Sequence, residues 1–321
     1  MFRFRMSWLG FAALLAAAFT LSGPVSAQTF PTQTVRIVVP FSAGSVTDIM
    51  ARIIADEMGR QWAQQVIVEN RPGLPGTVAV AQAKPDGYTL MLTSNGHTVA
   101  GLTNKNLSFD PIKDFAGITR VCSAPYVLIV NPEVPAKSVK ELIALAKSKP
   151  GTLNFSSPGL GSSTFIAGAL FRRAAGIDVV HVPYKGAPES VTAVVRGDAH
   201  MYFAPINLAK ELAEGGKVRA LALATPSRDP NMPNEPTFTE AGLPFVYDGW
   251  FGLMAPAGVP REIIAKINKD VVHMLGTPEA KAKLAAQFVL PVTDTPEAFD
   301  KIIRDETANL TQVFKEAGIG N

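Results

Sequence analysis

The sequence contains a single cysteine, Cys122, and only four histidines among its 321 residues. One thiol cannot form a disulfide within the chain, so we expect buried apolar cores to supply the stability. The histidines stand in unrelated contexts without the spacing of metal ligands, and there is no cysteine pair. From these absences we expect that the protein has no metal site and no cofactor. Cys122 lies in the apolar run 118–130, which predicts a buried small side chain.

Sequence patterns typical of catalysis are missing as well. The chain has no G-x-S-x-G elbow and no H-E-x-x-H motif, and no residue stands out as catalytic. We therefore expect a protein that is not an enzyme. An exported hydrolase or isomerase that uses scattered residues remains the alternative.

A marked apolar run occurs at the N-terminus. Arg3 and Arg5 precede the apolar stretch Trp8–Leu21, and the small residues Val25-Ser26-Ala27 follow it. A membrane-spanning helix needs roughly 20 apolar residues, whereas this order is typical of a cleaved secretory signal peptide. We expect residues 1–27 to be a signal peptide and the mature protein to lie in the periplasm.

Excess charge of one sign is also scarce. The formal net charge is +3, and removal of Arg3 and Arg5 with the signal peptide leaves +1. A nearly neutral chain does not suit nucleic acid, because clustered Lys and Arg supply most of that affinity. Removal of 27 residues also leaves 294, which is more than one hydrophobic core usually organises.

Short β-branched runs alternate with longer amphipathic stretches, which predicts an α/β architecture with mainly parallel strands. Residues 35–39, 66–68 and 89–92 are predicted strands. Apolar residues at helical spacing predict a helix over 46–60. The segment 70–76, rich in Gly and Pro, predicts a turn.

A short order of elements that occurs twice in the sequence predicts two lobes. The order strand, Pro, Val-Pro, helix occurs at 126–135 and again at 250–260. We expect lobe 1 to comprise 28–125, lobe 2 to comprise 126–224, and the chain to return to lobe 1 over 225–321. Ligands of open α/β sheets bind beyond the carboxyl ends of the strands, which predicts a ligand cleft between the lobes.

Two strand-to-helix loops, 40–48 and 154–164, carry glycines and hydroxyls. The free N–H groups and the positive dipole end of a helix suit an anion. Ser45 and Asp48 also have the spacing of a capping box, which needs no ligand. A third segment, 94–98, follows a predicted strand and has the composition either of a binding loop or of an ordinary turn. From these segments the predicted ligand-binding residues are Ser42, Ala43, Gly44, Ser45, Thr47, Asp48, Ser94, Asn95, His97, Ser157, Gly159, Gly161, Ser162 and Ser163.

Seven ordered blocks cover essentially the whole mature chain and resemble the Bug family, the substrate-binding components of tripartite tricarboxylate transporters. The blocks are Val35–Asp48, Val68–Gly73, Pro85–Leu90, Leu153–Ser157, His181–Gly186, Val218–Ala222 and Ala255–Gly258.

The resemblance implies a type II periplasmic-binding fold that closes on one small carboxylate, held by backbone groups, hydroxyls and water of loops 42–48 and 157–163. It implies a monomer that serves uptake, with membrane permease subunits as partners, or sensing. Tyr184 and Ala204 complete the candidate set. Ala204-Pro205 stands where the family often has an acid, so a usual indicator of ligand identity is missing.

Overall fold

The computed structural model describes residues 30–104, 106–160, 162–247 and 249–316. The expected signal peptide, 1–27, and the expected ligand residue Gly161 lie outside these ranges. Residues Gln33–Asn321 form one compact unit, and every element described below belongs to it.

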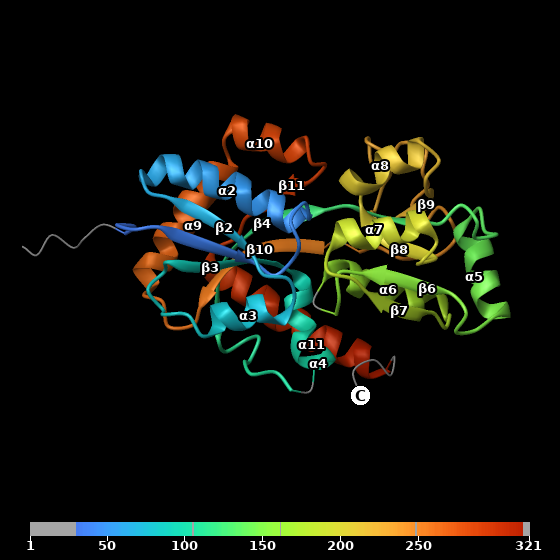
Figure 1. Ribbon diagram of the computed structural model, residues 1–321, viewed down its shortest axis with the longest axis horizontal. Coiled ribbons are helices and arrows are strands. Elements are labelled where there is room, and N and C mark those ends of the chain that lie inside the picture. Colours follow the sequence, from blue (N-terminus) through green and yellow to red (C-terminus); the bar gives the residue numbers. More distant parts are fainter. Residues whose placement is uncertain (1–29, 105, 161, 248, 317–321) are drawn as a thin grey trace, which may run out of the picture. The chain divides into compact units, whose positions relative to one another are not determined.

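The first lobe is built on a six-stranded sheet (Figure 1). Its strands, in spatial order, are β11 (Leu290–Pro291), β4 (Phe115–Ala124), β10 (Gly249–Pro256), β3 (Thr89–Ser94), β1 (Val35–Val39) and β2 (Val66–Asn70). The helices of this lobe are α2 (Val46–Trp62), α3 (Leu74–Ala81), the 3₁₀ helix η1 (Asn95–Val99), α4 (Ala100–Thr103), α9 (Arg261–Leu275), α10 (Pro278–Ala285) and α11 (Pro296–Glu316).

Helix α2 follows directly from the periodic pattern of its sequence. Met50, Ile54 and Met58 recur every four residues and are almost completely buried, as one face of a helix packed on a sheet requires. The predicted turn 70–76 is partly wrong, because α3 begins at Leu74 with Pro75 in its first turn. Proline is well tolerated at the start of a helix, since it has no N–H to leave unpaired.

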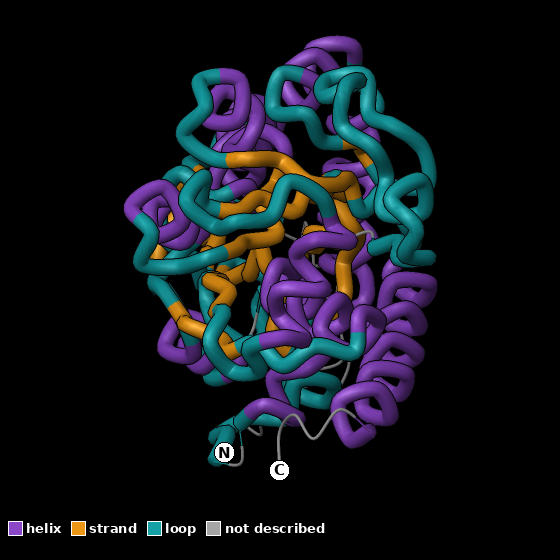
Figure 2. The backbone as a smooth tube through the Cα atoms, turned by 90° about the vertical axis from the view of Figure 1, so that its right-hand side faces the viewer, coloured by secondary structure: helices purple, strands orange, loops and turns teal. Residues whose placement is uncertain are grey.

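The second lobe is built on a five-stranded sheet with the order β7 (Val180–Pro183), β6 (Asn154–Ser157), β8 (Met201–Pro205), β5 (Tyr126–Val130) and β9 (Arg219–Leu223). Its helices are α5 (Val139–Ser148), α6 (Ser163–Ala175), α7 (Ala187–Arg196) and α8 (Ile206–Glu214). Figure 2 shows strands in the interior with helices and loops around them.

The expectation of mainly parallel strands is wrong. Strand β1 pairs in parallel with β2 and β3, but β10 runs antiparallel to β3 and β4. In the second sheet β5 runs antiparallel to both neighbours. Strands β5 and β10 each follow a crossing of the chain from the other sheet. No helix returns the chain across the same sheet before them, as in a βαβ unit, so they run antiparallel to their neighbours.

The chain passes between the two sheets twice, at Pro125 between β4 and β5 and between Tyr247 and the start of β10. Ala224–Thr225, directly after β9, lies beside these crossings, and we call Pro125, Ala224–Thr225 and Tyr247 the hinge segments. The backbone N–H of Ala224 donates to Tyr126 O at 2.8 Å, and that of Tyr247 donates to Ala224 O at 2.8 Å. The hinge is therefore a short hydrogen-bonded ladder. The lobe borders expected at 126 and 225 remain a prediction.

Each lobe has its own core. In the first lobe, Trp250, Phe299 and Met254 belong to one buried cluster. In the second, the rings of Phe171, Phe203, Phe238 and Phe245 lie with centroids 5.0 to 6.1 Å apart, distances typical of packed aromatic pairs. Cys122 is completely buried, which confirms the expected small apolar role.

Candidate functional site

The carboxyl ends of strands from both sheets meet at a small pocket between the lobes, which we call the cleft pocket. Its volume is about 30 Å³, and a water molecule needs roughly 10–15 Å³ of such space, so the gap between the lobes is narrow here. The lining residues are Phe41, Ser45, Val46, Thr47, Ser94, Tyr126, Pro158, Ser162, Ser163, Thr164, Ala187, Pro205 and Phe251.

The start of α2 forms the wall of the cleft pocket in the first lobe. Ser45 is the N-cap, and its hydroxyl accepts from Asp48 N at 3.2 Å. The Asp48 carboxylate accepts from Gly44 N and from Asn70 Nδ2, each at 2.9 Å, and pairs with Arg52. Asp48 does not line the pocket, so it holds the loop in shape while Ser45 both caps the helix and faces the ligand space.

These contacts set the charge state of Asp48. Burial raises its pKa, but the hydrogen bonds from Arg52, Gly44 and Asn70 outweigh burial and leave the pKa below its ordinary value. Asp48 is therefore a carboxylate at neutral pH. A buried charge that is fully paired fixes local geometry. The contacts of Asp48 therefore fix the conformation of the loop before α2.

The start of α6 forms the opposite wall. The hydroxyl of Ser162, the N-cap, accepts from Phe165 N at 3.2 Å and donates to Gly159 O at 2.7 Å. Ser163 and Thr164, the next residues, also line the pocket. Two helix N-termini therefore face one small space, each with the partial positive charge of its dipole.

The cleft pocket contains no charged side chain among its lining residues. The Ser94 hydroxyl is 2% exposed and has no hydrogen-bond partner among the described residues. Leaving a buried hydroxyl unsatisfied costs about 1–3 kcal/mol. The site thus offers helix dipoles, backbone N–H groups and one unused hydroxyl to a ligand that can accept hydrogen bonds.

The two lobes contact each other directly beside the pocket. The Ser42 hydroxyl donates to Glu189 Oε2 on α7 at 3.0 Å, and Ser163 donates a short hydrogen bond to Asn95 Oδ1. Each bond joins one lobe to the other. The closed arrangement of the lobes is therefore stabilised by specific hydrogen bonds between polar side chains of the two lobes.

Asn95 belongs to a buried polar cluster instead of the pocket wall. Its Nδ2 donates to Glu306 Oε1 at 2.8 Å and to the Tyr247 hydroxyl at 2.9 Å. Trp250 Nε1 donates to the other oxygen of Glu306 at 2.6 Å. Burial is the main cause of the raised pKa of Glu306. Asn95 thus connects the ligand-facing helix α6 to the hinge and to α11.

His97 lies in a neighbouring pocket that shares Phe41 and Pro158 with the cleft pocket and has a volume of about 170 Å³. Its Nε2 is 2.7 Å from Pro111 O, and its ring packs edge-on against Phe115. Burial is the main cause of the lowered pKa of His97, which falls to about 4. The imidazole is neutral and mainly structural.

The remaining predicted residues do not gather in the cleft pocket. Ala43 and Gly44 are exposed at the tip of the loop. The Ser157 hydroxyl is buried against His181 Nε2 at 2.7 Å, and Gly159 lines the neighbouring pocket. Tyr184 is partly buried and packs on the core of the second lobe, to which Ala204 belongs with no exposed surface.

Sequence reasoning missed the apolar lining, which includes Phe41, Tyr126, Pro205 and Phe251. Pro205 ends β8 one residue after the predicted Ala204, and Tyr126 begins the strand that follows a hinge segment. Apolar residues at strand ends carry no signal that separates a pocket wall from a core. These residues can be recognised as a pocket wall only in the structure, where the ends of the two sheets meet.

Over the described ranges, no group of three or more His, Cys, Asp or Glu side chains could hold a metal ion. Among the same residues, no helix has the length and apolar character that a membrane crossing requires.

Comparison with known proteins agrees with this geometry. Protein BugT of Bordetella pertussis is 32% identical over 316 residues, which cover 97% of both chains. The structure of R. palustris Rpa4515 with adipate is 32% identical, with a TM-score of 0.84 over 91% of this chain and 99% of the other. MatC from Rhodopseudomonas palustris with bound malate is 33% identical, with a TM-score of 0.82 over 88% and 99%.

The periplasmic binding protein BugD has a TM-score of 0.83 at 28% identity over 91% of this chain and 99% of its own. These neighbours confirm the two-lobed periplasmic-binding fold, and they are binding proteins, not enzymes. Residues 50–319 match the model of the tripartite tricarboxylate transporter family receptor, TctC. The chain therefore belongs to the TctC family of tripartite tricarboxylate transporter receptors, which includes the Bug proteins.

Proposed function

We propose that this protein is a periplasmic receptor that captures one small carboxylate in the cleft pocket. The observation that carries the proposal is the meeting of two capped helix N-termini, α2 and α6, around a space without charged side chains. Such N-termini stabilise a carboxylate through N–H groups and dipoles, without a cation. The adipate and malate in two related structures have the same chemistry.

The ligand-binding residues we propose are Ser45, Thr47, Ser94, Ser162, Ser163 and Thr164. All six line the cleft pocket and carry hydroxyls. The unused Ser94 hydroxyl would donate to the carboxylate. Closure of the lobes, stabilised by contacts to both walls at once, would retain the ligand.

The protein is exported, works as a monomer and has no catalytic step in this proposal. It delivers its ligand to membrane permease subunits or presents it to a sensor. The strongest feature in favour of an exported hydrolase is the pair Ser157 and His181, 2.7 Å apart. Ser157 has no exposed surface and does not line the cleft pocket, so a substrate in that pocket would not reach it.

Thermal unfolding with a panel of mono- and dicarboxylates tests the proposal. A ligand at about 100 times its Kd adds roughly 2.7 kcal/mol, which raises the midpoint by a few degrees. We expect Ser45→Trp, which fills the pocket and removes an N-cap, to abolish the shift. Ser138→Trp removes the comparable N-cap of α5 and should keep it. An equal shift in both variants would place the ligand elsewhere.

A further inference from the structure

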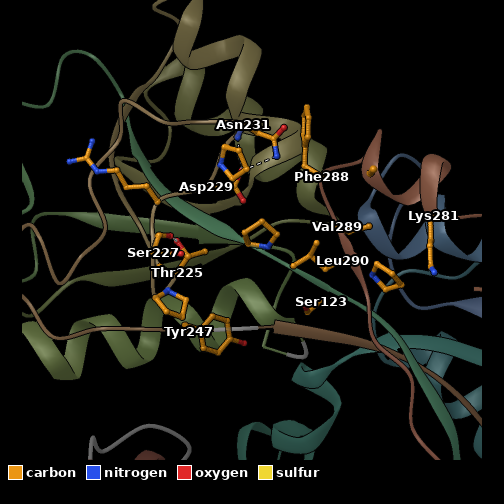
Figure 3. Close-up of a pocket in the computed structure, with 17 residues that line it drawn as sticks. Ser123, Thr225, Ser227, Asp229, Asn231, Tyr247, Lys281, Phe288, Val289 and Leu290 are labelled. Carbon is orange, nitrogen blue, oxygen red and sulfur yellow. Dashed lines mark hydrogen bonds between the residues drawn. The ribbon is translucent and has the colours of Figure 1, made fainter. Parts of the chain in front are cut away.

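A pocket much larger than the cleft pocket lies at the hinge between the lobes, and we call it the hinge pocket. Its volume is about 520 Å³, which is within the usual range for small-molecule sites. Figure 3 shows Phe288, Val289 and Leu290 on one side and Asp229 and Asn231 on the other. No part of the carboxylate site described above uses this space.

Both lobes and the hinge contribute to its walls. Phe288–Pro291 belong to the first lobe, Thr225–Asn231 follow the second-lobe strand β9, and Pro125 and Tyr247 are hinge segments. Lys210 of α8 lies 5.5 Å from the centroid of the Phe288 ring, so the two lobes also touch at the margin. A change in the angle between the lobes must therefore change the shape of the pocket.

The hinge pocket and the cleft pocket lie on opposite sides of the hinge. Pro125 lines the hinge pocket, whereas the next residue, Tyr126, lines the cleft pocket, as alternate residues of an extended chain do. The rings of Tyr126 and Tyr247 lie with centroids 5.7 Å apart. Tyr247 also lines the hinge pocket, and its hydroxyl bonds Asn95, the acceptor of the α6 residue Ser163. The two pockets share one wall.

The lining has the chemistry of an amphipathic site. Phe288, Val289 and Leu290 form an apolar side, and Leu290 is 65% exposed, which is unusual for a large apolar side chain beside other apolar groups. Of the charged lining residues, Arg228 is held by Glu240 at 3.0 Å, and Asp229 accepts from Asn231 N at 2.8 Å. Lys281 forms no ion pair among the described residues, whereas Lys283 on the same helix pairs with Glu57 and Glu279. Asp229 is satisfied by the backbone and side-chain N–H groups of Asn231, although no cation pairs with it. Lys281 is the lining cation that no carboxylate among the described residues neutralises.

We propose that the hinge pocket is a second ligand site, which takes an amphipathic monoanion with an apolar ring, and that its occupancy is linked to closure of the lobes. The ring lies on Phe288 and Leu290, and the acid group faces Lys281. Since the hinge separates the pockets, opening the cleft brings the walls of the hinge pocket together and weakens binding there. By linkage, an occupant of the hinge pocket favours the closed lobes to the same extent.

Fluorescence titration with 8-anilinonaphthalene-1-sulfonate, an aromatic monoanion, tests the site on the full protein. Ala285→Trp on α10 fills the hinge pocket, and we expect it to weaken dye binding about tenfold or more. Ala282→Trp is the matched control, because Ala282 is exposed on the same helix and does not line the pocket. Ser138→Trp, at the N-cap of α5 and away from both pockets, should also bind the dye normally.

Two further comparisons test the charge and the linkage. Lys281→Glu should weaken dye binding, whereas Lys140→Glu, on the exposed side of α5, should not. Gly186→Ala, which obstructs closure as argued below, should lower dye affinity in the absence of any carboxylate. Equal dye binding by Ala285→Trp and Ala282→Trp, or loss of binding in Ser138→Trp, would overturn the site. Unchanged affinity in Gly186→Ala would overturn the linkage.

Discussion

Ser42 and Gly186 approach each other across the cleft so closely that a Cβ atom on Gly186 would lie 1.7 Å from Ser42 Oγ. The backbone of Gly186 is extended, with φ −168° and ψ 179°, a conformation that any residue adopts. Glycine is therefore needed here for the approach of the opposite lobe and not for backbone strain. The pair reports on closure, because Ser42 belongs to the first lobe and Gly186, the N-cap of α7, belongs to the second.

We predict that Gly186→Ala weakens carboxylate binding by at least about tenfold while it leaves the unfolding midpoint of the ligand-free protein nearly unchanged. The added methyl group overlaps Ser42 and keeps the lobes from closing fully. Isothermal titration calorimetry measures the affinity, and Gly59→Ala in α2, where a Cβ atom makes only ordinary contacts, is the control.

A second substitution distinguishes obstruction from general damage. Ser42→Gly removes both the Oγ and Cβ atoms that a side chain at position 186 would meet. We expect the double variant Ser42→Gly, Gly186→Ala to recover part of the lost affinity. Ser42→Gly alone is the reference, because it also removes the hydrogen bond to Glu189. If Gly186→Ala weakened binding as much in the Ser42→Gly background as in the parent, the contact with Ser42 would not be the cause.

Two serine N-caps with matching hydrogen bonds separate helix stability from ligand binding. Ser162 caps α6 beside the cleft pocket and Ser138 caps α5, each accepting an N–H at 3.2 Å. Replacement of either serine by alanine should cost about 1 kcal/mol of unfolding free energy. Only Ser162→Ala should also weaken carboxylate binding. Equal affinity in both variants would exclude the α6 terminus from the site.

The stability of the protein should fall as the pH drops below 6.5. Burial lowers the pKa of His97 from 6.5 to about 4, so in this range the unfolded chain takes up a proton that the folded protein does not. From pH 7 to pH 5 the loss from His97 is about 2 kcal/mol. Urea unfolding at both pH values measures the difference.

His97→Gln should reduce that pH dependence, because a glutamine side chain does not titrate and can still donate to Pro111 O. If His97→Gln and the parent lost equal stability between pH 7 and pH 5, a protonated buried His97 would be indicated.

Much of the fold could be predicted because local patterns determine it. The strand 35–39, the helix from Val46 and the cap Ser138 follow from periodicity and capping chemistry. The antiparallel direction of β5 and β10 could not be predicted from local sequence. It arises from the crossings between the sheets, where Tyr126 bonds Ala224, a residue far along the chain.

The part of the candidate site that helix caps form was predictable from the sequence. Ser45 and Ser162 are visible as helix caps, and caps at the carboxyl ends of strands face a cleft. Asn95, His97 and Ala204 were also predicted to bind the ligand, but they do not line the cleft pocket. Their placement depends on tertiary packing. The partnership of Asn95 with Glu306, 211 residues away, has no local signal.

Calorimetry with a carboxylate that binds and with its primary amide of the same shape tests the central claim most directly. We predict that the carboxylate binds and that the amide loses at least about tenfold in affinity, because α2 and α6 stabilise negative charge in a pocket without cations. Equal binding of the acid and the amide would contradict the claim that two helix N-termini select an anion.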